Sequence, residues 1–395
     1  MKLLRKKNIQ KEKKCVVFLV ANIKQYRTVF YERLSKIMAL DNINIIVLYS
    51  EASKIELKKF DSVNLPEPLG FKIKRLYLLR DKILFQFVPL KFLMQADLII
   101  VVQSNGYLIN YLLQLLRIFG LNNLAFWGHG YNHQTRENSF LEKIKRLCAI
   151  KVDWWFAYTN NIANYLYRIG FPKEKITTIN NTIDTASFSM QVDGISQADR
   201  RKLIESLGFP QNAIVGIFCG SLYEDKQLEF LLKASAILHK KYQNFRLIVI
   251  GNGPKRKLLT DHSYKVSWLT YVGEQYELNK AKYFAISDFF LNPGLVGLSI
   301  LDSFAAGLPL ITTDYKKHSP EIFYLKEGKN GMKLPFDHKL FANGVIHLVQ
   351  NPRKLSLMKK EALMSSKKFT LENMVINVRD GILKYFEYSL KNQRR

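Results

Sequence analysis

The stretch DFFLNPGLVGLSILDSFAAGLPLITT, residues 288–313, decides the fold. Residues 288–292 are mostly apolar and few enough for one buried strand, whereas the small and apolar residues 299–306 predict a helix. Gly307 is a helix-stopping residue, and the apolar run 310–313 predicts a second strand. A strand, a helix and a strand in this order form a crossover between parallel strands. The stretch therefore predicts an α/β fold with a parallel sheet.

The same alternation continues along most of the chain. In the second half it predicts strands at 214–219, 246–250 and 267–272 and helices at 227–241 and 277–285. In the first half it predicts strands at 16–20, 43–48, 97–103, 124–127 and 154–158, and helices at 28–38, 82–95 (with a break at Pro89) and 107–118. Strands separated by helices are typical of a doubly wound sheet with helices on both faces.

The alternation is interrupted once, which indicates two domains. Residues 185–213 are polar and predict a loop-like linker with one short amphipathic piece. We expect a Rossmann-like domain at 1–184 and a second at 214–370, facing each other across a cleft. The last helix, within 371–395, is expected to pack back on the first domain. In such folds, ligands bind at the carboxyl ends of the strands.

The composition points to an anionic partner. The chain has 395 residues and 48% hydrophobic residues, which excludes a disordered scaffold. Lysine and arginine number 60 against 33 aspartates and glutamates, a formal net charge of +27. This charge attracts nucleic acid, a membrane surface or phosphorylated small molecules. The sequence has no zinc module, RNA-binding aromatic motif or basic recognition helix, so we expect no nucleic-acid partner.

The remaining composition predicts a cytoplasmic protein at an anionic membrane surface. The three cysteines lie far apart, which fits a reducing compartment and excludes a disulfide framework. The most apolar run, 107–120, contains Arg117 and is too short to span a bilayer. Basic residues accompany apolar ones at 2–14 and 72–91, a pattern that favours peripheral binding to anionic lipid. The alternative is that 83–94 is a core helix with a solvated lysine face.

Two motifs in the second half are suited to binding a phosphorylated ligand. In the first, Gly220 and Ser221 follow a strand and Lys226 precedes a helix, where an ammonium and free backbone N–H groups can hold a phosphate. The alternative is a solvated surface lysine. In the second, Asp302 lies one turn inside a helix and suits ribose hydroxyls, unless it is an ordinary solvated helix residue. The loop before this helix offers backbone amides at Gly294, Leu295, Val296, Gly297 and Leu298.

Further candidates lie at other predicted strand ends. His129 stands between two glycines after a strand of the first half, where it is exposed for proton transfer or sugar contact. A lone histidine is more often a packing or surface residue. Asn22 and Arg27 follow the first strand, and Glu321 follows the strand at 310–313. We expect these three to border the cleft.

Taken together, the motifs resemble glycosyltransferase family 4, a retaining group with the GT-B fold. The resemblance spans about residues 16–350. It rests on Gly220, Ser221, Leu222 and Lys226, on segments 249–254, 292–309, 320–322 and 328–331, and in the first half on Tyr26, Arg27, 127–130 and 175–188. It implies transfer of a sugar from a nucleotide-sugar without an essential metal or cofactor, and with retention at the anomeric carbon.

The resemblance also implies residue roles. Lys226 would bind the diphosphate, the amides of 294–298 the phosphate or sugar, Asp302 the ribose, and His129 would lie near the transferred sugar. Two positions depart from the family pattern. Gly294 replaces the first of two glutamates eight positions apart, which removes a contact to sugar hydroxyls. Ser221 replaces an arginine, which removes a cation near the diphosphate.

We therefore expect a retaining, hexosyl- or deoxyhexosyl-type glycosyltransferase whose acceptor is a lipid-linked saccharide, in surface polysaccharide assembly such as lipopolysaccharide or capsule. Two alternatives remain open at this point. One is a non-hydrolysing nucleotide-sugar 2-epimerase, which shares the two-domain fold. The other is a catalytically weak homologue that retains the binding site, which the loss of the glutamate at Gly294 suggests.

Overall fold

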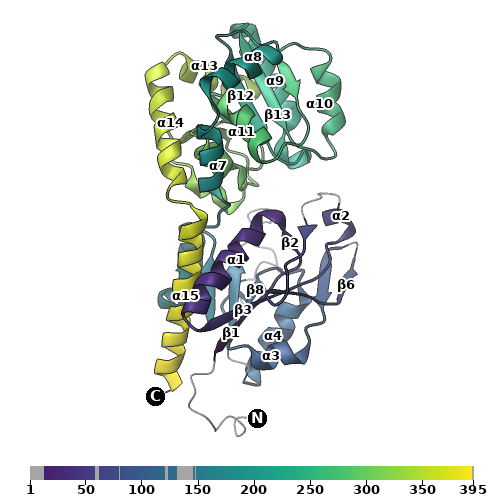
Figure 1. The fold of residues 1–395 in the computed structure, drawn as a ribbon, viewed down its shortest axis with the longest axis vertical. Helices are drawn as coiled ribbons and strands as arrows, with labels where there is room; N and C mark the ends of the chain where they lie inside the picture. Colours follow the sequence, from purple (N-terminus) through teal and green to yellow (C-terminus); the bar gives the residue numbers. More distant parts are fainter. Residues whose placement is uncertain are drawn as a thin grey trace. The chain divides into compact units, whose positions relative to one another are not determined.

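The structure is a computed structural model that describes residues 13–57, 62–79, 81–120, 123–130, 146 and 148–393. The chain divides into two compact units (Figure 1). The described residues of Met1–Tyr131 and Glu137–Ile179, together with Val375–Arg395, belong to the first unit, and Asn180–Met374 belong to the second. Among the described residues, the chain passes from the first unit to the second after Ile179 and returns to the first unit within its last helix.

The first unit is built on a seven-stranded parallel sheet. Its central strands are runs of apolar and β-branched residues that are buried on both faces, as the parallel arrangement requires. In spatial order, the strands are β11 (Ile176–Thr178), β10 (Trp154–Ala157), β9 (Leu124–Gly128), β8 (Leu98–Val102), β1 (Lys14–Leu19), β3 (Ile43–Tyr49) and β5 (Gly70–Lys72). Two short antiparallel pairs accompany it, β2 (Ile23–Lys24) with β4 (Ser62–Val63) and β6 (Arg75–Leu78) with β7 (Ile83–Gln86).

Helices cover this sheet, and one of them comes from the end of the chain. They are α1 (Gln25–Leu40), α2 (Lys54–Leu57), α3 (Leu90–Gln95), α4 (Leu108–Ile118), α6 (Asn160–Arg168) and α15 (Leu371–Gln393). Arg379 of α15 forms an ion pair with Asp41, and Tyr385 packs edge-on against Trp154 at 6.1 Å. Throughout the described ranges, no helix has the length and apolar character needed to cross a membrane.

The second unit repeats the architecture with a six-stranded parallel sheet. Its strands, in spatial order, are β14 (Leu269–Tyr271), β13 (Phe245–Ile250), β12 (Ile214–Cys219), β15 (Phe289–Leu291), β16 (Leu310–Thr313) and β17 (Gly331–Leu334). Its helices are α7 (Thr185–Asp193), α8 (Gln197–Ser206), α9 (Leu228–Lys241), α10 (Arg256–Ser263), α11 (Glu277–Ala285), α12 (Ser299–Ala305), α13 (His338–Val349) and α14 (Pro352–Ser366). The segment 288–313 forms β15, α12 and β16, as its sequence predicts.

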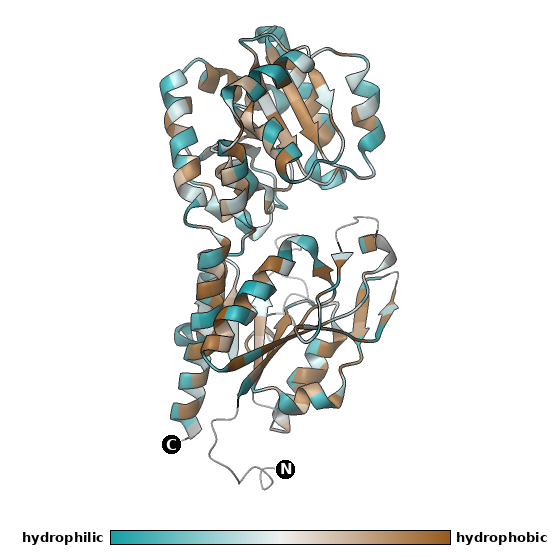
Figure 2. Ribbon diagram, in the orientation of Figure 1, coloured by the Kyte–Doolittle hydropathy of each residue, from teal (hydrophilic) through white to brown (hydrophobic). Residues whose placement is uncertain are grey.

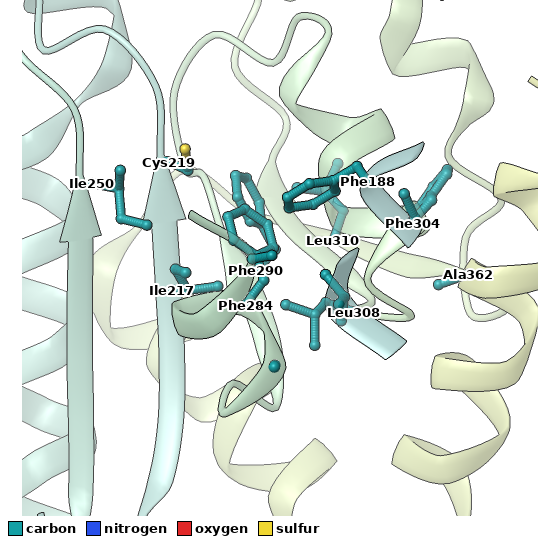
Figure 3. Close-up of a cluster of buried hydrophobic side chains, with 14 of the residues drawn as sticks. Phe188, Ile217, Cys219, Ile250, Phe284, Phe290, Phe304, Leu308, Leu310 and Ala362 are labelled. Atoms are coloured by element: carbon teal, nitrogen blue, oxygen red, sulfur yellow. The ribbon is translucent and has the colours of Figure 1, made fainter. Parts of the chain in front are cut away.

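Apolar layers on both faces of the second sheet hold this unit together. On one face, Ile217 and Phe290 of the sheet pack with Phe188 and Phe284 of the covering helices (Figure 3). The rings of Phe188 and Phe284 meet edge to face with centroids 5.2 Å apart. Cys219 is the last residue of β12 and closes this layer at the carboxyl edge of the sheet. The lysine motif, which starts at Gly220, therefore follows directly after the last core residue of β12.

Glycine allows two loops to approach each other at this carboxyl edge. Gly251, directly after β13, has φ +141°, and a Cβ atom on it would overlap the carbonyl oxygen of Gly220. The loops that follow β12 and β13 are therefore in backbone contact, and Gly220 donates its N–H to the carbonyl of Ile250 at 3.0 Å. This close approach fixes the start of the lysine motif.

Two sequence predictions are wrong at the level of local structure. Residues 83–86 form strand β7 instead of the first part of a helix, because they pair with β6 in an antiparallel hairpin. Residues 185–213 are largely helical instead of loop-like. Asp184 and Ser196 cap α7 and α8 by accepting backbone N–H bonds, and Phe188 and Val192 of α7 are buried in the core of the second unit.

Candidate donor-binding site

Lys226 is buried at the carboxyl edge of the second sheet. It ends a short 3₁₀ turn, Glu224–Lys226, and Gln227 then adopts a left-handed conformation (φ 56°) before α9 begins at Leu228. The side chain of Lys226 is only 6% exposed, and its Nζ donates to the carbonyl of Leu295 at 2.5 Å. The lysine therefore points into the protein at the neighbouring loop, which differs from a solvated surface lysine.

Burial sets the protonation of this lysine. Removal from water lowers the pKa of Lys226 to about 8, although Cys219 and Asp225 nearby oppose the shift. Burial also raises the pKa of the Cys219 thiol, to about 12, so this cysteine stays protonated. The carboxylate of Asp225 is held by the Tyr315 hydroxyl at 2.6 Å and the Lys317 ammonium at 3.0 Å, and these bonds lower the pKa of Asp225. Near neutral pH, Lys226 is thus a buried cation beside an anchored carboxylate.

Gly294 allows the neighbouring loop to lie directly on the lysine turn. A Cβ atom at this position would overlap the carbonyl oxygen of Asp225 and lie 2.5 Å from the carbonyl carbon of Lys226. Leu295 next to it donates its backbone N–H to the Asp225 carbonyl at 2.7 Å. The backbone contact explains why glycine stands at 294 in this chain, since the glutamate of the family pattern has no room there.

His318 also anchors the loop that contains Gly294. Its Nδ1 accepts the backbone N–H of Val296 at 3.1 Å, and its Nε2 lies 2.8 Å from the carbonyl of Thr313. Together these contacts require the neutral tautomer with the proton on Nε2, which donates to Thr313. Burial lowers the pKa of His318, in keeping with that neutral form.

The predicted set of phosphate-binding amides is therefore wrong in part. The N–H of Leu295 is used by Asp225 and the N–H of Val296 by His318, so neither is available to a ligand in this conformation. Gly297 and Leu298 follow them, at the start of α12, and are partly exposed. The ligand-facing part of the loop is consequently shorter than 294–298.

Asp302 forms an ion pair that the sequence did not indicate. Its Oδ1 lies 2.7 Å from Nζ of Lys280 on α11, and the two side chains are only 12% and 20% exposed. The Lys280 ammonium also lies 4.3 Å from the centre of the Phe188 ring on α7. Although desolvation opposes it, Asp302 keeps the pKa of Lys280 above its usual value. The carboxylate therefore carries its own counter-ion.

Ser221 and Glu321, two further predicted residues, have different surroundings. Ser221 is exposed after β12. Glu321 is only 2% exposed, lies in a 3₁₀ turn (Pro320–Tyr324), and accepts a hydrogen bond from Asn181 Nδ2 at 2.6 Å. Its carboxylate is thus part of the internal packing of the second unit, which is a different environment from an open site edge.

In the first unit, His129 and Arg27 lie near the carboxyl end of β9. His129 is exposed between Gly128 and Gly130, and its ring packs edge-on against Tyr158 at 4.7 Å. Arg27 is buried, with its guanidinium 5.5 Å from the Trp127 ring centre. Tyr158 also meets Trp127 edge to face, so these side chains form one aromatic group at the end of β9.

Asn22 lies apart from that aromatic group. Its Nδ2 donates to Ser62 Oγ at 3.0 Å, and it lines a cavity of about 300 Å³ with Tyr49, Glu51 and Asn64.

With regard to metals, the described ranges contain no group of three or more histidine, cysteine, aspartate or glutamate side chains arranged to hold an ion.

Residues 213–351, which include Lys226, Gly294 and Asp302, match the family described as Glycosyl transferases group 1. This segment of the chain is similar to the group 1 glycosyltransferases. Two curated proteins are similar to this chain over part of their length. Alpha-monoglucosyldiacylglycerol synthase of Acholeplasma laidlawii is 28% identical over 178 residues, 43% of this chain and 43% of that protein.

The second relative is the putative glycosyltransferase EpsD of Bacillus subtilis, 26% identical over 196 residues, 46% of this chain and 49% of that protein. The chain thus matches less than half the length of either relative. Among solved structures, Anabaena HepE in complex with UDP superimposes with a TM-score of 0.65 at 15% identity, over 93% of this chain and 99% of that one. At this identity the likeness is one of fold, and that fold is GT-B, as the motifs predict.

Proposed function

We propose that the chain is a retaining glycosyltransferase that moves a sugar from a nucleotide-sugar to a lipid-linked saccharide in surface polysaccharide assembly. The observation that carries the proposal is the buried Lys226 in a group 1 glycosyltransferase segment, tied to the loop that contains Gly294. A buried ammonium at the carboxyl edge of a parallel sheet suits the diphosphate of a nucleotide-sugar. The complex of HepE with UDP supports the choice of a nucleoside diphosphate.

Lys226 supplies the chemistry that the reaction needs. When the bond between the anomeric carbon and the diphosphate oxygen breaks, negative charge develops on the leaving diphosphate. A preorganised cation in a site of low dielectric stabilises that charge more than it stabilises the intact donor. Two carboxylates of this unit are held by other side chains, Asp225 by Tyr315 and Lys317 and Asp302 by Lys280. We therefore assign no covalent nucleophile and propose attack of the acceptor on the face from which the diphosphate departs.

The remaining roles follow from the placement of the residues. We propose that Asp302 accepts hydrogen bonds from the ribose hydroxyls through the oxygen that Lys280 does not hold. We propose that His129, which is exposed on its turn, contacts the transferred sugar. A lipid-linked acceptor is supported by the relative whose name specifies a glucosyldiacylglycerol and by the net charge of +27, which favours an anionic membrane surface at the cytoplasmic face.

A nucleotide panel and a transfer assay test the proposal. We expect one of UDP, GDP, dTDP and CMP to raise the melting temperature, since a ligand of the native state stabilises it by mass action. With the matching nucleotide-sugar and lipid-linked saccharides, we expect transfer of the sugar with retention of its anomeric configuration. This transfer activity should persist in the presence of EDTA. Loss of transfer in EDTA that Mn²⁺ restores would contradict metal independence. Conversion of the donor without any acceptor would identify an epimerase, and nucleotide binding without turnover would identify a binding homologue.

We also expect the affinity for the nucleoside diphosphate to depend on pH through Lys226. The pKa of Lys226 in the folded protein is about 8, and binding to the diphosphate needs the ammonium form. Affinity measured by calorimetry should therefore fall by up to about tenfold per pH unit above about pH 8. The groups that face this lysine do not titrate in that window, because the pKa values of Cys219 and Tyr223 are raised and those of Asp225 and His318 are lowered.

Folding stability should change in the opposite direction over the same pH range. Since the pKa of Lys226 is lower in the folded than in the unfolded chain, the unfolded chain binds more protons between about pH 8 and 10.5, and this contribution to stability rises with pH.

A Lys226→Met variant provides the control for the binding measurement, and its affinity for the nucleoside diphosphate should not fall above about pH 8. An unchanged pH profile in that variant would show that another group is responsible.

A further inference from the structure

Helix α4 of the first unit carries two neighbouring apolar stripes, one buried and one exposed. Ile109 and Leu113 are buried in the core beneath the sheet. On the outside, Leu108, Leu112, Leu115 and Phe119 follow one another at spacings of four, three and four residues, which places them on one stripe. The stripe grows more exposed along the helix, with Leu115 52% and Phe119 80% exposed. A helix that only covers a core has polar residues on its outer face, so this second stripe needs a different explanation.

Helix α3 repeats the pattern on the same side of the sheet. Phe92 of α3 belongs to the same buried cluster as Leu113 of α4, so both helices cover one face of the sheet. The outer residues of α3 are Leu90 and Met94, four positions apart, which are 67% and 60% exposed. Figure 2 shows hydrophobic residues on both helices. We name the outer residues of the two helices, Leu90, Met94, Leu108, Leu112, Leu115 and Phe119, the α3–α4 face.

The hairpin beside α4 extends this apolar region. Leu84 of β7 bridges to Tyr107, directly before α4, and donates its N–H to the carbonyl of Gly106 at 2.7 Å. The partner strand β6 exposes Leu76 and Leu78, two residues apart and hence on one side of the hairpin. Exposed apolar side chains are therefore concentrated between residues 76 and 119.

Basic side chains accompany these apolar ones. Lys74 and Lys82 are exposed between β5 and α3, and Lys91 is exposed on α3, with its Nζ 4.9 Å from the ring centre of Phe92. In the same part of the chain, the described acidic residues are Asp81 and Asp97, and Asp97 is engaged with the backbone N–H of Cys15. The region therefore combines apolar stripes with an excess of positive charge.

We propose that the α3–α4 face is a membrane-docking surface that inserts its apolar residues among the lipids of an anionic bilayer. Leucine and phenylalanine stripes bury apolar area at the boundary of headgroups and acyl chains, and nearby lysines attract anionic headgroups. Charge disfavours a second copy of this chain as the occupant, because it would bring the same lysines against each other and the chains carry +27 each. The choice of a bilayer rests on the proposed function, in which the acceptor is anchored in lipid.

Vesicle co-sedimentation of the full chain tests the proposal. We expect binding to phosphatidylglycerol–phosphatidylcholine vesicles at low salt, weaker binding as salt rises, and much weaker binding to pure phosphatidylcholine. The variant Leu115→Glu/Phe119→Glu should lower the partition coefficient at least tenfold. The matched control is Leu357→Glu on α14 of the second unit, a leucine that is 63% exposed, and it should bind as the unchanged chain does.

Each outcome decides the proposal. Equal partition coefficients for the double variant and the control would overturn it, since another surface of the protein would then bind the vesicles. Binding to neutral vesicles that is as strong as to anionic ones would overturn the role of the lysines. Self-association that the double variant abolishes, without vesicle binding, would identify a second copy as the occupant. The nucleotide panel reports separately on the donor site, so vesicle binding without any nucleotide binding would contradict the proposed function and leave the docking surface standing.

Discussion

Substitution of Gly294 by alanine is expected to disable the second unit's site and weaken its fold together. The added methyl group would overlap the Asp225 carbonyl oxygen and press against the carbonyl group of Lys226. Backbone atoms cannot rotate away as a side chain can, so the loop and the lysine turn must separate. We expect the free energy of unfolding to fall by about 1–3 kcal/mol. Because Lys226 moves with the turn, transfer activity should fall by about 10²-fold. Urea denaturation and the transfer assay measure the two effects.

A neighbouring glycine provides the control for this variant. A Cβ atom at Gly297 would meet nothing closer than Ser319 Oγ at 3.7 Å, an ordinary van der Waals contact. The Gly297→Ala variant should therefore unfold at nearly the same urea concentration as the unchanged chain. If both alanine variants were equally stable, the close approach at Gly294 would not be a constraint in solution.

Replacement of Lys226 by methionine should abolish most transfer activity while leaving the protein folded. Loss of a single group that stabilises transition-state charge typically costs about 10²–10³-fold in rate, and we expect a fall of that order in kcat. The fold should tolerate the change because methionine fills a similar volume and removes a buried charge that is costly to hold. The Leu295 carbonyl would keep the Asn292 Nδ2 donor at 3.3 Å.

The control for the lysine is Lys233→Met, an exposed position on α9. It removes the same charge from the chain and should change neither kcat nor nucleotide affinity. A Lys226→Met enzyme with more than a tenth of the original kcat would exclude leaving-group stabilisation by this residue. Retained thermal stability in that variant separates a chemical role from a structural one.

Much of the fold could be predicted from the sequence because the central strands are unambiguous. Strands 214–219 and 310–313 have the predicted bounds, since apolar runs between turn residues leave few alternatives, and helix 277–285 also has its predicted bounds. The error at 83–86 arose because a short apolar run fits a strand or a helix equally well until its partner is known. The error at 185–213 arose because the few apolar residues of α7 are separated by polar ones and become buried only against α11 and α12.

The candidate site could be predicted only where its residues belong to a local motif. Lys226, Gly294 and Asp302 stand in short patterns along the chain, and these patterns are visible in the sequence. The roles of Lys280 and His318 could not be predicted, because each depends on a partner that is distant in sequence: Asp302 for the lysine, and the Val296 amide for the histidine. Glu321 stood in a recognisable motif, but only the structure shows that its carboxylate is directed at Asn181.

The return of the chain to the first unit through α15 determines how this protein can be divided for experiments. Gly381 of α15 is in direct contact with Phe156 and Thr177 of the first unit, and Asn377 donates to the Ile179 carbonyl. A fragment that stops near residue 179 would expose Trp154 and Phe156 to water and should aggregate when expressed. The described residues of the second unit, in contrast, form one uninterrupted segment, Asn180–Met374. It can be excised with a single start and stop, while the first unit can be produced alone only by joining 13–179 to 375–393 through an engineered linker.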